Sequence, residues 1–92
     1  MEFVKGTNRF YKEEDGKLLA EVTFVDQGDV VAIDHTFVDP SLRGQGIAEK
    51  LVDRVVEEME KENKKIVPVC PYVVTLFDRK ADKYGHIHAD NN

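Results

Sequence analysis

The stretch that decides the fold joins a β-type run to an amphipathic run, and it reads Val38-Asp39-Pro40-Ser41-Leu42-Arg43-Gly44-Gln45-Gly46-Ile47-Ala48. Before it, β-branched and aromatic residues over 30–38 predict a strand, which ends at Pro40 because proline cannot donate a ladder hydrogen bond. After it, apolar residues recur with the period of a helix. They are Ile47, Ala48, Leu51, Val52, Val55, Val56 and Met59. We therefore expect a strand, a short loop over 41–45 and a helix over about 44–63.

Such a junction is suited to binding an anion. The first amides of a helix have no partner within the helix, and the helix dipole adds about half a positive charge there. Gly44 and Gly46 allow a ligand to approach the backbone closely, because they carry no side chain. Arg43 adds a permanent cation whose fork matches phosphate. Phosphate is thus the expected ligand chemistry.

Outward toward the N-terminus, the pattern predicts an antiparallel meander. Residues 9–14, 17–25 and 30–38 have strand character, whereas 2–10 are poorly patterned. Asp15-Gly16 and Gln27-Gly28-Asp29 mark the two tight turns between these strands.

Toward the C-terminus, residues 65–69 predict a fourth strand, irregular at Pro68. Residues 72–80 predict a short helix with Pro71 at its start. The order β-β-β-α-β-α predicts an α/β fold in which the strands 30–38 and 65–69 run parallel, as a crossover through a helix requires.

Length and composition predict a single domain over 1–92, with a polar tail over 83–92 that is expected to fray. The net charge of −5 argues against nucleic acid as a partner. The lone Cys70 excludes an intramolecular disulfide and favours a reducing compartment. The chain has no secretory signal pattern and no apolar run of about 20 residues, so we expect a cytoplasmic protein that does not enter membranes.

Three phosphate-binding motifs compete for the junction. A Walker loop needs G-x-x-x-x-G-K-[ST], which is absent. A Rossmann fingerprint needs a third glycine where Glu49 stands. The segment 43–48, Arg-Gly-Gln-Gly-Ile-Ala, instead resembles the pyrophosphate loop Q/R-x-x-G-x-G/A of the GNAT (N-acetyltransferase) superfamily. Its flanks, with Val38-Asp39-Pro40 upstream and the apolar helix downstream, resemble that superfamily too.

The resemblance covers about 18–72 and implies a minimal GNAT-like fold that binds acetyl-CoA. His35-Thr36 and Cys70-Pro71-Tyr72-Val73 resemble a small stand-alone subfamily. In such proteins the loop amides hold the CoA pyrophosphate and the preceding strand bonds the pantetheine arm. Carried over, the cofactor-binding residues are Phe37, Val38, Arg43, Gly44, Gln45, Gly46, Ile47 and Ala48.

Ordinary members of the superfamily have N-terminal helices between their first two strands, which help to form the acceptor pocket. Here Asp15-Gly16 predicts a tight hairpin instead. We therefore expect an acceptor side that is open or completed by a partner.

Three residues are candidates for the chemistry. Cys70 precedes a helix start, where a thiol pKa can fall, and is a candidate acetyl acceptor; an inert core cysteine is the alternative. His35 is a candidate base or a candidate activator of Cys70; the alternative is a half-exposed strand residue that faces solvent or a helix. Tyr72 is a candidate proton donor, or a core aromatic. Asp34 neighbours His35 on a strand, so we expect the two side chains to face opposite sides.

Other charged residues have plainer interpretations. Arg79, Lys80 and Lys83 form a basic cluster that either reaches the CoA 3′-phosphate or is a solvated helix face. His86 and His88 lack further ligands at metal-binding spacing, and no metal site is predicted.

Three functional hypotheses follow. The first is an acetyl-CoA-dependent N-acetyltransferase that acts on an unidentified amine or protein, with Cys70 as a carrier of the acetyl group. The second is a CoA-binding module without efficient turnover, and the third is an interaction domain that has lost the ligand. The sequence is compatible with a monomer or a weak homodimer.

Overall fold

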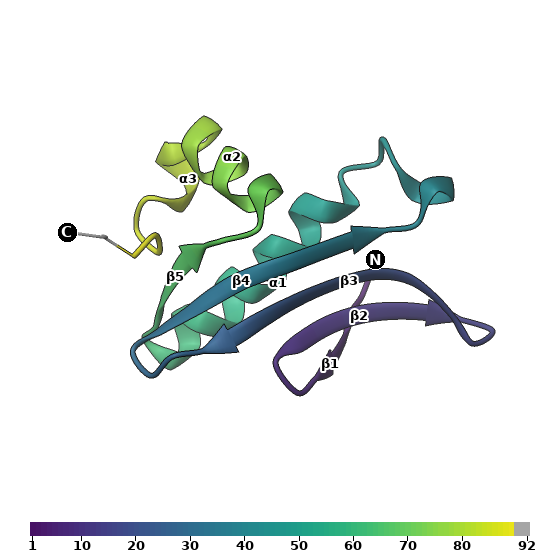
Figure 1. Cartoon of the computed structure of the whole chain (residues 1–92), viewed down its shortest axis with the longest axis horizontal. Coiled ribbons are helices and arrows are strands. Elements are labelled where there is room, and N and C mark those ends of the chain that lie inside the picture. Colours follow the sequence, from purple (N-terminus) through teal and green to yellow (C-terminus); the bar gives the residue numbers. More distant parts are fainter. Residues whose placement is uncertain (90–92) are drawn as a thin grey trace.

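A computed structural model describes residues 1–89, which form one five-stranded sheet in the order β1-β2-β3-β4-β5 and four helical segments (Figure 1). The elements are β1 (Val4–Gly6), β2 (Arg9–Glu14), β3 (Lys17–Asp26), β4 (Val30–Val38), the 3₁₀ helix η1 (Pro40–Leu42), α1 (Ile47–Glu62), β5 (Lys65–Pro68), α2 (Pro71–Arg79) and α3 (Ala81–Tyr84). The predicted α/β fold class is confirmed.

The first four strands form the expected antiparallel meander. Asp15 and Gly16 take the positive φ angles of 52° and 79° that a tight hairpin requires. The strand β1 was not predicted, since its three residues are too few to show an alternating pattern. It joins β2 through a turn in which Asn8 has a φ of 56°.

The crossover from β4 through α1 to β5 makes these two strands parallel, as predicted. One face of α1 packs on the sheet because six apolar side chains recur there at helical spacing. They are Ile47, Leu51, Val52, Val55, Val56 and Met59. The helix ends at Asn63, which adopts the left-handed conformation with a φ of 57°.

The expectation of a frayed tail from residue 83 is wrong for residues 83–89, and 90–92 lie outside the described residues. Tyr84 and Ile87 are 1% and 3% exposed, and the ring of Tyr84 stacks on Phe77 with centroids 4.7 Å apart. Ile66 donates its N–H to the Ile87 carbonyl, and its own carbonyl accepts from Ala89. Because most residues of this segment are polar, the sequence pattern did not reveal that Tyr84 and Ile87, three positions apart, belong to the core.

The molecule has two layers. In Figure 1 the strands lie in front of α1, with α2 and α3 beside β5. Within residues 1–89 no helix covers the front of the sheet. No helix in this part of the chain is both long and apolar enough to cross a membrane.

Candidate functional site

The strands β4 and β5 separate halfway along β4. Their ladder ends at the Ile33–Pro68 pair. The N–H groups of Val69 and Cys70 then both donate to the Ile33 carbonyl, at 3.0 and 2.9 Å, so the chain turns away into α2. Figure 1 shows β4 continuing beyond the end of β5, with β3 along its other side. Within residues 1–89, the second half of β4 is paired only with β3.

The pairing with β3 decides which backbone groups face this open edge. Asp39 donates its N–H to the Leu19 carbonyl at 2.7 Å. Since antiparallel neighbours alternate between bonded and non-bonded pairs, Phe37 also directs its backbone groups to β3, opposite Glu21. Thr36 and Val38 direct theirs to the open edge. The structure thus brings Val38 to the edge as expected, whereas the backbone of Phe37 is already engaged by β3.

The loop after β4 is shaped by Asp39, which is 7% exposed. Its carboxylate accepts from the Ser41 N–H at 3.0 Å and from the Ser41 hydroxyl, and Lys17 lies 3.5 Å away. These hydrogen bonds from Ser41, and then the charge of Lys17, lower the pKa of Asp39. The segment predicted as an irregular loop therefore begins with the 3₁₀ turn η1.

The start of α1 presents a row of backbone donors. Gly44 and Gly46 have φ angles of +85° and +71°, and a side chain at Gly46 would strain the left-handed N-cap. No side chain in the described part of the chain caps this helix, whose first bond runs from the Lys50 N–H to the Gly46 carbonyl at 3.1 Å. The N–H groups of residues 44–49, which include the predicted Gln45, Ile47 and Ala48, find no acceptor among residues 1–89.

Arg43 borders this row of donors. Its Nε donates to the Val38 carbonyl at 3.4 Å, and the side chain is exposed. The guanidinium therefore lies at the corner between the open edge of β4 and the N-terminus of α1. A negative group placed there meets the arginine, the helix dipole and free N–H groups together.

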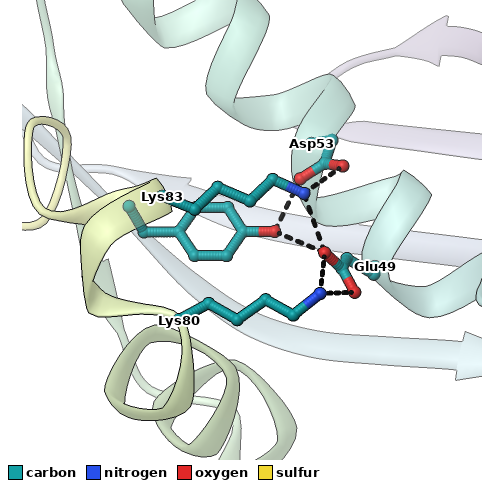
Figure 2. Close-up of polar contacts among 5 residues, drawn as sticks. Glu49, Asp53, Lys80 and Lys83 are labelled. Carbon is teal, nitrogen blue, oxygen red and sulfur yellow. Dashed lines mark hydrogen bonds and ion pairs between the residues drawn. The ribbon is translucent and has the colours of Figure 1, made fainter.

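A charged cluster lies one turn into α1 (Figure 2). Lys83 and Lys80 bring their Nζ atoms within 2.7 and 2.9 Å of the Glu49 carboxylate. These hydrogen bonds, from Lys83 and then Lys80, lower the pKa of Glu49 to about 2. Lys83 also pairs with Asp53 at 3.0 Å, and the Tyr84 hydroxyl donates to Asp53 at 2.6 Å. The basic cluster, for which the sequence left open a contact with the CoA 3′-phosphate or a solvated helix face, is tied to α1 through two of its lysines.

Cys70 lies where β4 and β5 separate. It is the N-cap of α2, is 8% exposed, and its Sγ is 3.5 Å from the Thr36 hydroxyl. Since Thr36 is one of the two residues that face the open edge, the thiol lies beside that edge. Tyr72 follows two residues later and is 36% exposed. Desolvation, followed by the charge of Glu49, raises the pKa of Tyr72.

The structure does not bring His35 to Cys70. A β-bulge in β4 places Ile33 opposite Phe24 and His35 opposite Thr23, with Asp34 between them. Asp34 and His35 are both exposed, and the Thr23 hydroxyl donates to Asp34 at 2.6 Å. Both side chains therefore lie on the sheet face away from Cys70. The expectation that Asp34 and His35 face opposite sides is wrong, because a bulge breaks strict alternation.

Sequence reasoning gave no role to three contributors to this region. Thr36 was quoted only as part of the family resemblance, since a strand threonine carries no signal of its own. Glu49 and Asp53 have the i, i+4 spacing of one helix face, which is the signal that links them. Their partners, Lys80 and Lys83, were recognised in the sequence only as members of a basic cluster. Of the unassigned histidines, His86 lies 2.6 Å from Glu60 and His88 packs its edge on Phe77.

Comparisons with known proteins agree with this geometry. The sequence model of the GCN5-related N-acetyl-transferase family matches residues 9–87. A GCN5-like protein from Staphylococcus aureus, solved in solution by NMR, is 31% identical with a TM-score of 0.80. The match covers 99% of this chain and 90% of that one. A comparison with curated proteins found no significant match.

Longer acetyltransferases share the same core. A ribosomal-protein-alanine N-acetyltransferase from Brucella melitensis is 26% identical with a TM-score of 0.62. A predicted acetyltransferase from Clostridium acetobutylicum, crystallised with acetyl-CoA, is 25% identical with a TM-score of 0.59. Each match covers 91% of this chain but only 62% and 60% of the longer ones. The family match over most of the chain, together with the open β4 edge and the donor row of α1, shows that the protein belongs to the GCN5-related N-acetyl-transferase family.

Proposed function

We propose that the protein binds acetyl-CoA along the open edge of β4 and transfers its acetyl group to an amine. The observation that carries this proposal is the junction itself. Within residues 1–89, the backbone groups of Thr36 and the N–H of Val38 have no strand partner at the open edge, and they lead directly to the free N–H groups at the start of α1. A ligand that joins amide groups to a diphosphate, as CoA does, matches both features. The Clostridium relative with bound acetyl-CoA supports the same ligand.

The binding mode follows from the donors. The diphosphate accepts from the N–H groups of residues 44–49, beside Arg43. The pantetheine arm runs along β4, where the backbone groups of Val38 and then Thr36 are available to its amides. The thioester then lies near Cys70, at the point where the two strands separate.

The reaction replaces a carbon–sulfur bond by a carbon–nitrogen bond. The neutral amine attacks the thioester carbonyl, the nitrogen gives up one proton as it becomes an amide, the bond to sulfur breaks, and CoA leaves as a thiol once it has taken up a proton. Tyr72, two residues beyond Cys70, is the candidate donor of that proton. In the two-step route, the Cys70 thiolate first takes the acetyl group and releases CoA, and the amine then attacks the new thioester. His35 lies on the opposite face of β4 and fits a role on the acceptor side only.

The second candidate is a CoA-binding module without efficient turnover. One observation favours it: between residues 1 and 39 the chain forms strands and tight turns, with no helix to wall an acceptor pocket. The acceptor side is therefore the bare face of the sheet. An amine on a protein surface suits such an open site better than a small free amine.

Calorimetric titration with CoA tests the binding proposal. Gly46→Glu places a negative side chain at the donor row, and we expect at least a tenfold loss of affinity, or about 1.4 kcal/mol. Gly28→Glu is the matched control. Gly28 also has a positive φ and open space for a side chain, but lies in the turn between β3 and β4. Unchanged affinity in Gly46→Glu, or no CoA binding by the native chain, would refute the binding mode.

Intact mass spectrometry tests the two-step route. After incubation with acetyl-CoA, the native chain is expected to gain one acetyl group that Cys70→Ala does not gain. If neither protein gains mass while acetyl-CoA is consumed with an amine, the transfer is direct and Cys70 only lines the thioester.

A further inference from the structure

The two lysines of the charged cluster in Figure 2 are held differently. Lys83 lies between two carboxylates, at 2.7 Å from Glu49 and 3.0 Å from Asp53. Lys80 contacts Glu49 alone, at 2.9 and 3.0 Å from its two oxygens. If Lys80 left, Glu49 would still be paired with Lys83. Lys80 is therefore the cation of the cluster that can change partner without leaving a carboxylate unpaired.

The position of Lys80 places it beside the donor row. Glu49 is the third residue of α1, and its own N–H is one of the free donors at the helix start. Lys80 lies at the C-cap of α2, and its side chain is 43% exposed. The ammonium group thus contacts the carboxylate of a residue that belongs to the donor row, and its partly exposed side chain can rotate toward solvent.

We propose that Lys80 exchanges partners on ligand binding, leaving Glu49 for a phosphate group of the bound CoA thioester. This inference rests on the proposed function, since it assigns a further ligand to the same site. The chemistry is a lysine–phosphate ion pair, supplied by either the diphosphate or the ribose 3′-phosphate of CoA. Glu49 is the built-in competitor, because its carboxylate occupies Lys80 in the ligand-free protein.

The charges explain why the exchange is favourable. Bound CoA brings several negative charges next to the Glu49 carboxylate, which Lys83 continues to contact. The Lys80 ammonium is attracted more strongly to the doubly charged diphosphate or 3′-phosphate than to a monovalent carboxylate. Lys83 stays between Glu49 and Asp53, so α3 remains fastened to α1.

The test compares the affinities of CoA and dephospho-CoA for three variants by calorimetry. In Lys80→Met the cation is lost, and we expect CoA to bind about fivefold more weakly, the upper end for a partly exposed ion pair. In Glu49→Gln the competitor is lost, and CoA is expected to bind severalfold more tightly. Lys64→Met is the matched control, because Lys64 pairs with Asp26 at 3.1 Å near the turn between β3 and β4.

The outcomes separate the sources of the phosphate. A loss in Lys80→Met for CoA alone assigns Lys80 to the 3′-phosphate, and an equal loss for both ligands assigns it to the diphosphate. CoA affinity that is unchanged in Lys80→Met, or lowered to the same extent in Lys64→Met, overturns the proposal. If Glu49→Gln fails to fold, the Lys80→Met comparison decides alone. Absence of CoA binding by the native chain refutes the proposed function instead.

Discussion

At the scale of single residues, the site depends on backbone conformation as much as on side chains. Gly46 combines a φ of +71° with open space around its α-carbon. We expect Gly46→Ala to lower the free energy of unfolding by about 1 kcal/mol, because a β-carbon is strained in the left-handed region and not because it collides with a neighbour. Urea denaturation measures the change, and a loss near zero would show that the N-cap relaxes.

Tyr84 is a second residue whose contribution can be isolated. Its hydroxyl donates to the Asp53 carboxylate at 2.6 Å, while its ring is buried against Phe77. Ionisation of the Tyr84 hydroxyl is disfavoured, since burial and the hydrogen bond to Asp53 raise the pKa of this group. Tyr84→Phe keeps the ring and removes the bond to a charged group, so we expect a loss of about 1.5–3 kcal/mol in urea denaturation. A native-like stability would mean that water replaces the hydroxyl.

At the scale of elements, Asn63 ends α1 in the left-handed conformation with a φ of 57°. Glycine adopts this conformation without the β-carbon penalty. Asn63→Gly is therefore expected to raise the free energy of unfolding by up to about 1 kcal/mol. Asn63→Ala serves as the opposing control and should lower it, and a destabilised Asn63→Gly would contradict the capping argument.

The elements with a clear period were predictable from the sequence. The helix α1 and the strands β3 and β4 were found at nearly their observed bounds, because each repeats a core-facing pattern over nine residues or more. The same reasoning located the donor row, since glycines beside an amphipathic helix start are a local signal.

Features that depend on register or on distant partners were not predictable. The bulge at Asp34 is set by how β3 and β4 twist together, so strict alternation misplaced that side chain. The tail over 83–89 looked polar because its buried apolar residues, Tyr84, Ile87 and Ala89, are separated by polar ones. That Phe37 pairs with β3 while Val38 faces the open edge also follows only from the observed register.

At the scale of the whole molecule, stability should depend on acid pH through Glu49. Its pKa is about 2 in the folded protein, below the ordinary value of 4.5. A lowered pKa means that this contribution is complete above about pH 4.5 and is lost as the pH falls toward 2. We expect the urea midpoint to fall over this window, and to fall less in Glu49→Gln than in Glu57→Gln, an exposed glutamate on the same helix. Equal pH profiles would contradict the role of the cluster.

The half of β4 that has no partner on its β5 side within residues 1–89 has a consequence for the protein in solution. Ladder groups of Thr36 and the N–H of Val38 are available on this edge, which is a template on which strands of other chains can add. A ligand lying along that edge would occupy the same groups. The ligand-free chain is thus expected to self-associate more readily on warming than the CoA-saturated chain, as light scattering can measure. Ligand binding is therefore expected to protect the folded protein from aggregation through this strand edge.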